Sequence, residues 1–230
     1  MLLFGGRLLA ITMIFVLFPG AAVYVDAAAL SCEKSPVIFS CDNDSDFKCL
    51  CSTANAALDF LSSIGLVTRD CISVRLVEHI SSNSDHTLIG QYDPVLREVR
   101  LLTYAKVIEL VDLNKLMPGI AMSDELWCSY AAHELAHVIS CKYLSSHIKA
   151  HTAGEYISAV TQLSVLSPRV RKEILNRYAD IEAYHSRSEM SELYFLMDPN
   201  KFAVKCYKHF ITLDNPKGFI DMLVREGNGY

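Results

Sequence analysis

The sequence predicts an α+β fold, in which a small antiparallel or mixed sheet of about three strands precedes a mainly helical carboxy-terminal half. Apolar and polar residues alternate in parts of the first half, as in strands, whereas helix-start signals recur from residue 123 onward. Eight cysteines in 230 residues further predict that disulfides staple this fold.

Residues 1–29 have the features of a secretory signal peptide. Arg7 precedes an uncharged apolar run of eleven residues, Leu8 to Phe18, and several alanines then offer small residues for cleavage. The alternative is an uncleaved membrane anchor, but a spanning helix needs about 20 apolar residues, and Pro19-Gly20 interrupts this run. We therefore expect an exported protein, periplasmic or secreted, with no stable membrane span after cleavage.

The remaining chain is long enough for one sizeable core, or for one core with an appended subdomain. We expect a cysteine-rich amino-terminal region with one helix at 30–69 and a main domain at 70–230. The formal net charge is −5, and no run of Lys and Arg occurs, so nucleic acid is not an expected partner.

All eight cysteines follow the predicted signal, which favours disulfides in an oxidising compartment. A zinc knuckle is the alternative, but Cys49-x-Cys51 is too close for the usual Cys-x(2–4)-Cys pair. Cys128 and Cys141 cannot pair on one helix, because thirteen residues span about 20 Å and a disulfide needs Cα atoms within about 7 Å. Five cysteines predict a stapled amino-terminal region: Cys32, Cys41, Cys49, Cys51 and Cys71.

Residues 30–51 are rich in turn residues and cysteine, and we expect a polar loop at 42–46. Ser52 is a candidate cap for a helix over about 53–64, which Gly65 would end.

Three strands are expected next. Cys71–Ile80 alternates in the period of a strand, and shorter strands are plausible at Thr87–Tyr92 and Glu98–Thr103, with a turn at Asp93-Pro94 between them. A short helix over 104–112 follows.

The second half is predicted to be helical. Ser123 would cap a helix that runs to about Tyr143, and Thr152 would cap the next one, which ends near Leu166. Proline at a favoured first helical position predicts three further helix starts, at Ser167-Pro168, Asp198-Pro199 and Asn215-Pro216.

The segment His133-Glu134-Leu135-Ala136-His137 carries the expected chemistry. Two histidines four residues apart lie about 40° apart around a helix and about 6 Å along it, so both rings can bind one Zn²⁺. Glu134 could then act as general base on a zinc-bound water. A surface helix with two ordinary histidines is the alternative, but chance yields this pattern in roughly one or two such chains in a hundred.

A catalytic zinc needs a third protein ligand. Ser140 and Tyr143 stand where a metzincin has glycine and histidine, and Cys141 lies about 12 Å from His133 along the helix axis. Glu155 is the first acidic residue on the following helix, although Thr152-x-x-Glu155 also fits a capping box that needs no metal. Three acidic residues remain in reserve: Glu173, Asp180 and Glu182.

Supporting residues are less well defined by sequence. Ser158 and Gln162 share a helix face with Glu155 and could hydrogen-bond the metal ligands without binding the metal themselves. A donor for the oxyanion of the substrate is suggested by residue type alone at Tyr156, Tyr178, His185 and His209. His151 is expected to face solvent, and Trp127 to pack in the core.

With His133, Glu134 and His137 in this arrangement, the sequence resembles the gluzincin zinc metallopeptidases, the thermolysin-like group. That resemblance implies a zincin-like fold over about residues 70–225, and a glutamate on the helix after the motif as third ligand, which is Glu155 by position. The stretches Glu155-Tyr156-Ile157 and Gln162-Leu163-Ser164 also look like an uncharacterised family of bacterial exported proteins, DUF6639.

The expected function is therefore that of an exported zinc metallopeptidase, which hydrolyses bonds in a peptide or protein substrate, with the substrate lying along a strand at the sheet edge. One alternative is a secreted, disulfide-rich binding protein whose zinc is structural and closed by a fourth ligand such as His151. The other is a zinc hydrolase of a non-peptide amide or a cell-wall bond.

Overall fold

The computed structural model describes residues 29–33, 35–41, 44–81, 88–93, 95–112, 120–144 and 148–227. The predicted signal peptide lies outside these residues, apart from Ala29, which belongs to the first strand. None of the helices in the described part of the chain has the length and apolar character needed to cross a membrane.

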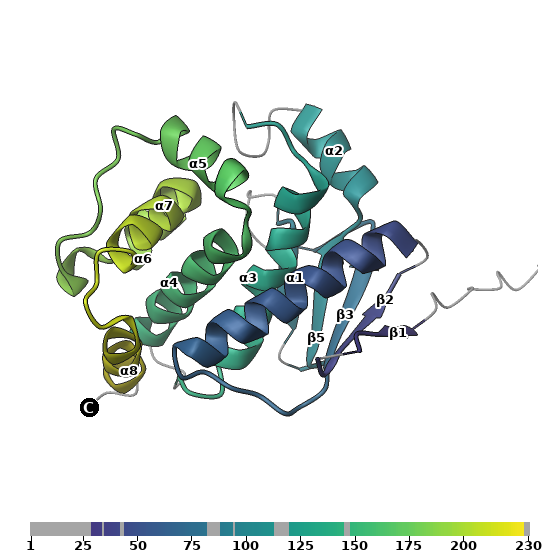
Figure 1. Cartoon of the computed structure of the whole chain (residues 1–230), viewed down its shortest axis with the longest axis horizontal. Helices are drawn as coiled ribbons and strands as arrows, with labels where there is room; N and C mark the ends of the chain where they lie inside the picture. Colours follow the sequence, from purple (N-terminus) through teal and green to yellow (C-terminus); the bar gives the residue numbers. More distant parts are fainter. Residues whose placement is uncertain are drawn as a thin grey trace, which may run out of the picture.

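The protein has an α+β fold, as predicted (Figure 1). Within the described residues the sheet has five strands in the order β1-β2-β3-β5-β4. The central strands β2, β3 and β5 run parallel, whereas β1 and β4 lie at the edges and pair antiparallel. The strands are β1 Ala29–Ser31, β2 Val37–Ser40, β3 Ile72–Val77, β4 Gly90–Asp93 and β5 Glu98–Leu102.

The prediction of about three strands was too low, because β1 and β2 lie in the segment expected to be turn-rich. Val37 and Phe39 are fully buried and alternate with half-buried Ile38 and Ser40, but this run of four residues is too short to identify alone. What makes it a strand is parallel pairing with β3, where Val37 faces Ile72 across 35 residues of sequence.

Helices make up most of the chain after the sheet, and they stack away from it in successive layers (Figure 1). α1 and α3 lie next to the sheet, α4 packs on both of them, and α7 and α8 pack on α4. The helices are α1 Asp44–Ser63, α2 Tyr104–Asp112, α3 Asp124–Ser140, α4 Ile148–Val165, α5 Pro168–Arg177, α6 Glu192–Met197, α7 Pro199–Phe210 and α8 Pro216–Gly227.

The start of α1 was predicted wrongly. The helix begins at Asp44 rather than after Ser52, which is exposed in the middle of it. One helical stripe, at a spacing of four, three and four residues, is fully buried and fixes this longer helix against the core. It consists of Leu50, Ala54, Ala57 and Leu61.

The predicted caps of the carboxy-terminal half are confirmed with one exception. Ser123 accepts a hydrogen bond from the backbone N–H of Leu126 at 3.2 Å, and the serine and aspartate before Pro168 and Pro199 cap in the same way. Thr152 is not a cap, because α4 already begins at Ile148.

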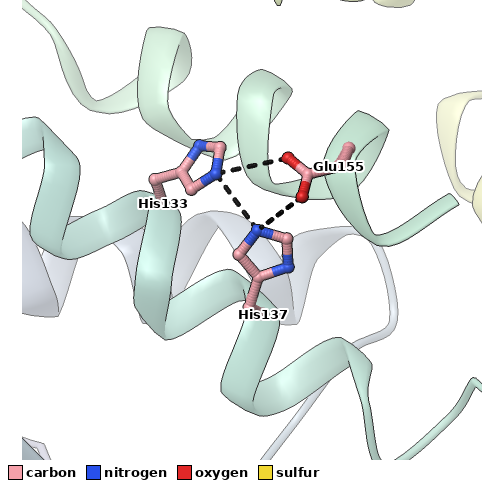
Figure 2. A group of neighbouring side chains, drawn as sticks. All are labelled: His133, His137 and Glu155. Atoms are coloured by element: carbon pink, nitrogen blue, oxygen red, sulfur yellow. Dashed lines mark hydrogen bonds and ion pairs between the residues drawn. The ribbon is translucent and has the colours of Figure 1, made fainter. Parts of the chain in front are cut away.

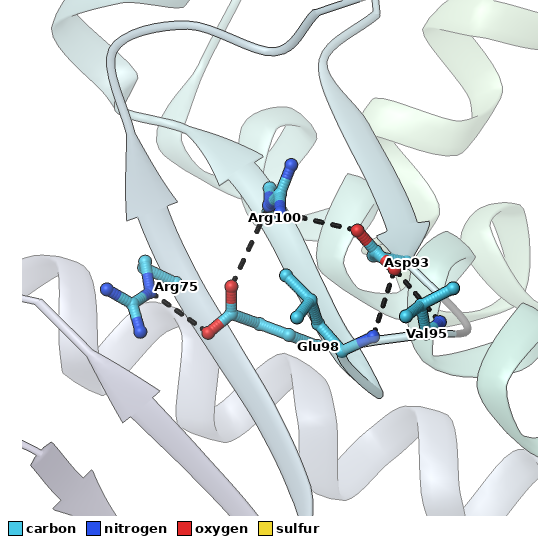
Figure 3. Close-up of polar contacts among 6 residues, drawn as sticks. Arg75, Asp93, Val95, Glu98 and Arg100 are labelled. Carbon is cyan, nitrogen blue, oxygen red and sulfur yellow. Dashed lines mark hydrogen bonds and ion pairs between the residues drawn. The ribbon is translucent and has the colours of Figure 1, made fainter.

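The β4–β5 hairpin is tied to the sheet by a chain of charged side chains (Figure 3). Asp93 accepts hydrogen bonds from two backbone N–H groups of the turn, at Val95 and Leu96, and its other oxygen lies 3.3 Å from Arg100. Glu98 bridges Arg100 and Arg75, with its closer contact, 2.9 Å, to Arg75. These contacts fix the position of the edge strand β4 relative to β5 and β3.

Two disulfides join four of the eight cysteines, all of which lie in the described part of the chain. Cys32–Cys51 staples the amino-terminal strands to α1, as the cysteine cluster predicted, with Cα atoms 5.6 Å apart. Cys49–Cys128 ties α1 to α3 with Cα atoms 6.2 Å apart. Cys128 therefore bonds a cysteine of another element and not Cys141, in agreement with the helix geometry.

Replacing both Cys49 and Cys128 with serine is expected to lower the free energy of unfolding by about 2–5 kcal/mol, because the bond closes a long loop in the unfolded chain. Chemical denaturation monitored by circular dichroism measures the change. Cys71→Ser is the matched control, since Cys71 is exposed and carries no disulfide. Equal stability of the double variant and the wild type would refute a bracing role for this disulfide.

Candidate metal centre

The helix that carries the two histidines is held firmly between the sheet and α4. Leu135 and Ile139 of α3 are fully buried, and Trp127, as predicted, packs in the core with only 1% of its surface exposed. The indole N–H of Trp127 donates to the carbonyl of Leu102 on β5 at 2.9 Å. This anchoring leaves the face with His133 and His137 directed toward α4.

His133, His137 and Glu155 converge on one point between α3 and α4 (Figure 2). The two Nε2 atoms lie 3.1 Å apart, and the carboxylate oxygens of Glu155 lie 3.5 Å from His133 Nε2 and 3.4 Å from His137 Nε2. Tetrahedral bonds of about 2.0–2.1 Å would place ligand atoms about 3.3–3.4 Å apart. The measured separations are close to this value, with each histidine nearest a different oxygen of Glu155, so the group could hold a metal ion.

Glu155 reaches this point because α4 runs close to α3. A Cβ atom on Gly154 would lie 3.6 Å from His137 Nδ1, so the backbone of α4 passes next to that imidazole. Thr152 lies inside α4 and does not cap it, so the capping box that offered an alternative role for Glu155 is not formed. The three reserve acids, Glu173, Asp180 and Glu182, are exposed and lie outside the group.

A hydrogen-bonded chain orients His133. Its Nδ1 lies 3.2 Å from Gln162 Oε1, the amide N–H of Gln162 donates to Ser129 Oγ at 3.3 Å, and Ser129 donates to a backbone carbonyl. Because an amide oxygen only accepts, Nδ1 carries the proton and Nε2 keeps its lone pair for a metal. Gln162 therefore lies where the sequence suggested, whereas the buried Oγ of Ser158 has no hydrogen-bond partner among the described residues.

Glu134 is buried on the side of α3 that faces the edge strand β4. Its carboxylate accepts a hydrogen bond from the backbone N–H of Tyr92, and a Cβ atom on Gly90 would lie only 2.7 Å from its Cγ. Burial raises the pKa of Glu134, while the charges of His133 and His137 oppose that shift. A raised pKa suits a carboxylate that accepts and returns a proton near neutral pH.

The charges of the group are strongly coupled. Burial alone would lower the pKa of His137, but the charge of Glu155 and a hydrogen bond to it outweigh burial and raise that pKa to about 9. Burial alone would raise the pKa of Glu155, but His137 and His133 hold it well below its usual value. In the metal-free protein the carboxylate is therefore ionised and His137 carries a proton at pH 7.

Zn²⁺ binding at pH 7 is expected to release about one proton, because a ligating imidazole must be neutral and His137 is protonated below about pH 9. The apparent affinity should accordingly rise between pH 7 and 9. Because the pKa of His137 is higher in the folded than in the unfolded protein, its protonation stabilises the metal-free fold. This contribution to the free energy of unfolding is complete below about pH 6.5 and is lost as the pH rises through about 9. Titration calorimetry in buffers of different ionisation enthalpy measures the number of protons released. Release of no proton at pH 7 would contradict the protonation of His137 in the metal-free protein.

The residues suggested as oxyanion donors do not join the group. Tyr156 bonds His209 at 2.8 Å among buried aromatic rings, and His185 pairs with Glu182 on the surface. Tyr178, at the end of α5, offers its carbonyl to a lysine of α7. Sequence reasoning considered His151 only as a possible fourth ligand and did not predict its contact with Glu155, in which Nε2 lies 3.6 Å from Oε1. The spacing of four residues on one helix was the available signal.

The fold and the site define an α+β protein with a candidate metal centre of two histidines and one glutamate on adjacent helices. Residues 37–228 match DUF6639, a family of unknown function, and the chain belongs to that family. The matched residues include the whole candidate centre, and the predicted likeness to DUF6639 is confirmed. No curated protein and no solved structure matches the chain, so the likeness to gluzincins stays a prediction.

Proposed function

We propose that this protein is an exported, zinc-dependent metallopeptidase. The observation that carries the proposal is the convergence of His133, His137 and Glu155 at separations that suit tetrahedral metal bonds, with the carboxylate of Glu134 buried next to them. Two disulfides among the described residues support export, because such bonds persist in oxidising compartments.

The donor set supports zinc as the metal. Two imidazole nitrogens with one carboxylate oxygen are a known ligand set of catalytic zinc sites, which keep a fourth position open. Mg²⁺ and Ca²⁺ prefer oxygen ligands. The alternative metal for this donor set is Fe²⁺. Metal analysis of protein purified without chelator distinguishes them: one zinc per chain supports the proposal, and iron in its place contradicts it.

Each residue has a distinct role in the proposed reaction. A Zn²⁺ held by His133, His137 and Glu155 would supply Lewis acidity, which would polarise the scissile carbonyl and lower the pKa of the attacking water. Glu134 takes a proton from the attacking water and delivers it to the leaving amine. The backbone N–H of Tyr92 holds the Glu134 carboxylate, and Gln162 holds the ring of His133.

The edge strand β4 supports a peptide as substrate. It lies at the end of the sheet order and touches Glu134 through Gly90 and Tyr92. An extended peptide that pairs with the outer side of β4 would continue the sheet and place its backbone carbonyls beside α3. A small-molecule amide would gain nothing from this strand, which is why we favour peptide hydrolysis.

Glu134→Gln is expected to lower the rate of peptide hydrolysis at least about 100-fold while zinc content stays at the wild-type level, because the amide cannot accept the proton and Glu134 is not a ligand. A fluorogenic peptide library and metal analysis measure the two properties. Glu173→Gln, an exposed glutamate outside the site, is the control.

Two results would reject the peptidase. If wild-type protein cleaves peptidoglycan fragments and no peptides, the centre serves a different amide or cell-wall bond. If it binds zinc and cleaves neither class of substrate, the binding-protein alternative with a structural metal is correct.

Gly90→Ala is expected to reduce activity about 100-fold with zinc retained, because the added Cβ would lie 2.9 Å from Glu134 Oε1 and force the carboxylate away from its position. Gln91→Ala changes the neighbouring residue, whose side chain points to the opposite face of the strand, and should keep full activity. Steady-state kinetics compare the two; a fully active Gly90→Ala enzyme would show that this contact is unimportant.

A further inference from the structure

His151 connects the candidate metal centre to a separate helix. It lies on α4, four residues before Glu155, and its Nε2 is 3.6 Å from Glu155 Oε1. Its Nδ1 is 3.6 Å from Glu192 Oε1, at the start of α6. Both nitrogens of one ring therefore face carboxylate oxygens, one from a proposed metal ligand and the other from a helix that contributes no ligand.

An aromatic side chain also contacts the His151 ring, although 48% of the His151 side chain is exposed. Phe195 of α6 meets it edge-on, with ring centroids 5.7 Å apart. Phe195 in turn packs edge-on against Phe202 at 5.4 Å, and Phe202 is almost fully buried. The orientation of His151 is thus linked through α6 to the core, which distinguishes it from an ordinary surface histidine.

We propose that His151 is a positioning residue for the metal ligand Glu155, and that Glu192 and Phe195 hold it in place. Its Nε2 lies 3.6 Å from Glu155 Oε1, within the range of an ion pair but beyond that of a hydrogen bond, and limits the rotation of the carboxylate, so that an oxygen stays directed at the metal. Partners of this kind are common around metal-ligating carboxylates, and losing one typically weakens metal binding about 10–100-fold. The inference rests on the metal centre of the proposed function.

The geometry favours this role over that of a fourth ligand. The three ligand atoms of His133, His137 and Glu155 lie within 4.8 Å of one another, and no nitrogen of His151 belongs to that group. A ring nitrogen that faces the oxygen of a ligand, rather than the point shared by all three, contacts the ligand itself.

The test measures the dissociation constant of Zn²⁺ by competition with a chromophoric chelator, on the folded, disulfide-bonded protein. His151→Ala is expected to weaken binding about 10–100-fold with one zinc per chain at saturation. His151→Gln keeps an N–H donor and should recover most of the affinity, and Glu192→Ala should weaken binding in the same direction. His185→Ala is the matched control, because His185 forms a similar pair with Glu182 away from the site.

The outcomes separate the possible roles. Wild-type affinity in His151→Ala, with the metal-free variant folded by circular dichroism, overturns the inference and leaves the proposed function intact. A changed absorption spectrum of the Co²⁺-loaded variant, which reports an altered ligand set, also overturns it and makes His151 a ligand. Wild-type protein that binds no zinc refutes the proposed function itself. Weakened binding, an unchanged cobalt spectrum and recovery by His151→Gln together support positioning.

Discussion

The structure of the site depends on one constraint: the carboxylate of Glu155 is buried between two helices and needs positive partners there. Its side chain is only 9% exposed, and an isolated carboxylate in such surroundings would be costly. Protonated His137 is such a partner when no metal is bound, and a cation would be one when the site is filled. The close packing of α3 on α4 is therefore tied to the chemistry of the three side chains, and not only to apolar contact.

Much of this site could be predicted because its key relationships are local. The spacing of His133 and His137 defines a shared helix face whatever the rest of the chain does, and Ser123 marks the start of that helix. Gln162 was found by the same helical periodicity. Glu155 required more, since the capping box with Thr152 competed with it until the start of α4 was known. Its identification relied on resemblance and is now supported by distance.

The features that could not be predicted from the sequence depend on contacts between distant parts of the chain. β2 is a strand because it pairs with β3, and Ser52 lies inside α1 because a buried stripe extends upstream of it. Eight cysteines allow 105 pairings, and only the packing of α1 on α3 selects Cys49 with Cys128. His151 is exposed, as its residue type predicted, but its contact with Glu192 of α6, 41 residues further along the chain, could not be predicted from that residue type.

The disulfide between Cys49 and Cys128 determines the stage of biogenesis at which the helix with the two histidines reaches its final rigidity. It attaches the helix of the two histidines to the amino-terminal region, and it can form only where thiols are oxidised. In an exported chain, the brace on that helix is thus absent during synthesis and is added after translocation. For the exported protein that we propose, full rigidity of the helix with the two histidines would then be reached only outside the reducing interior of the cell.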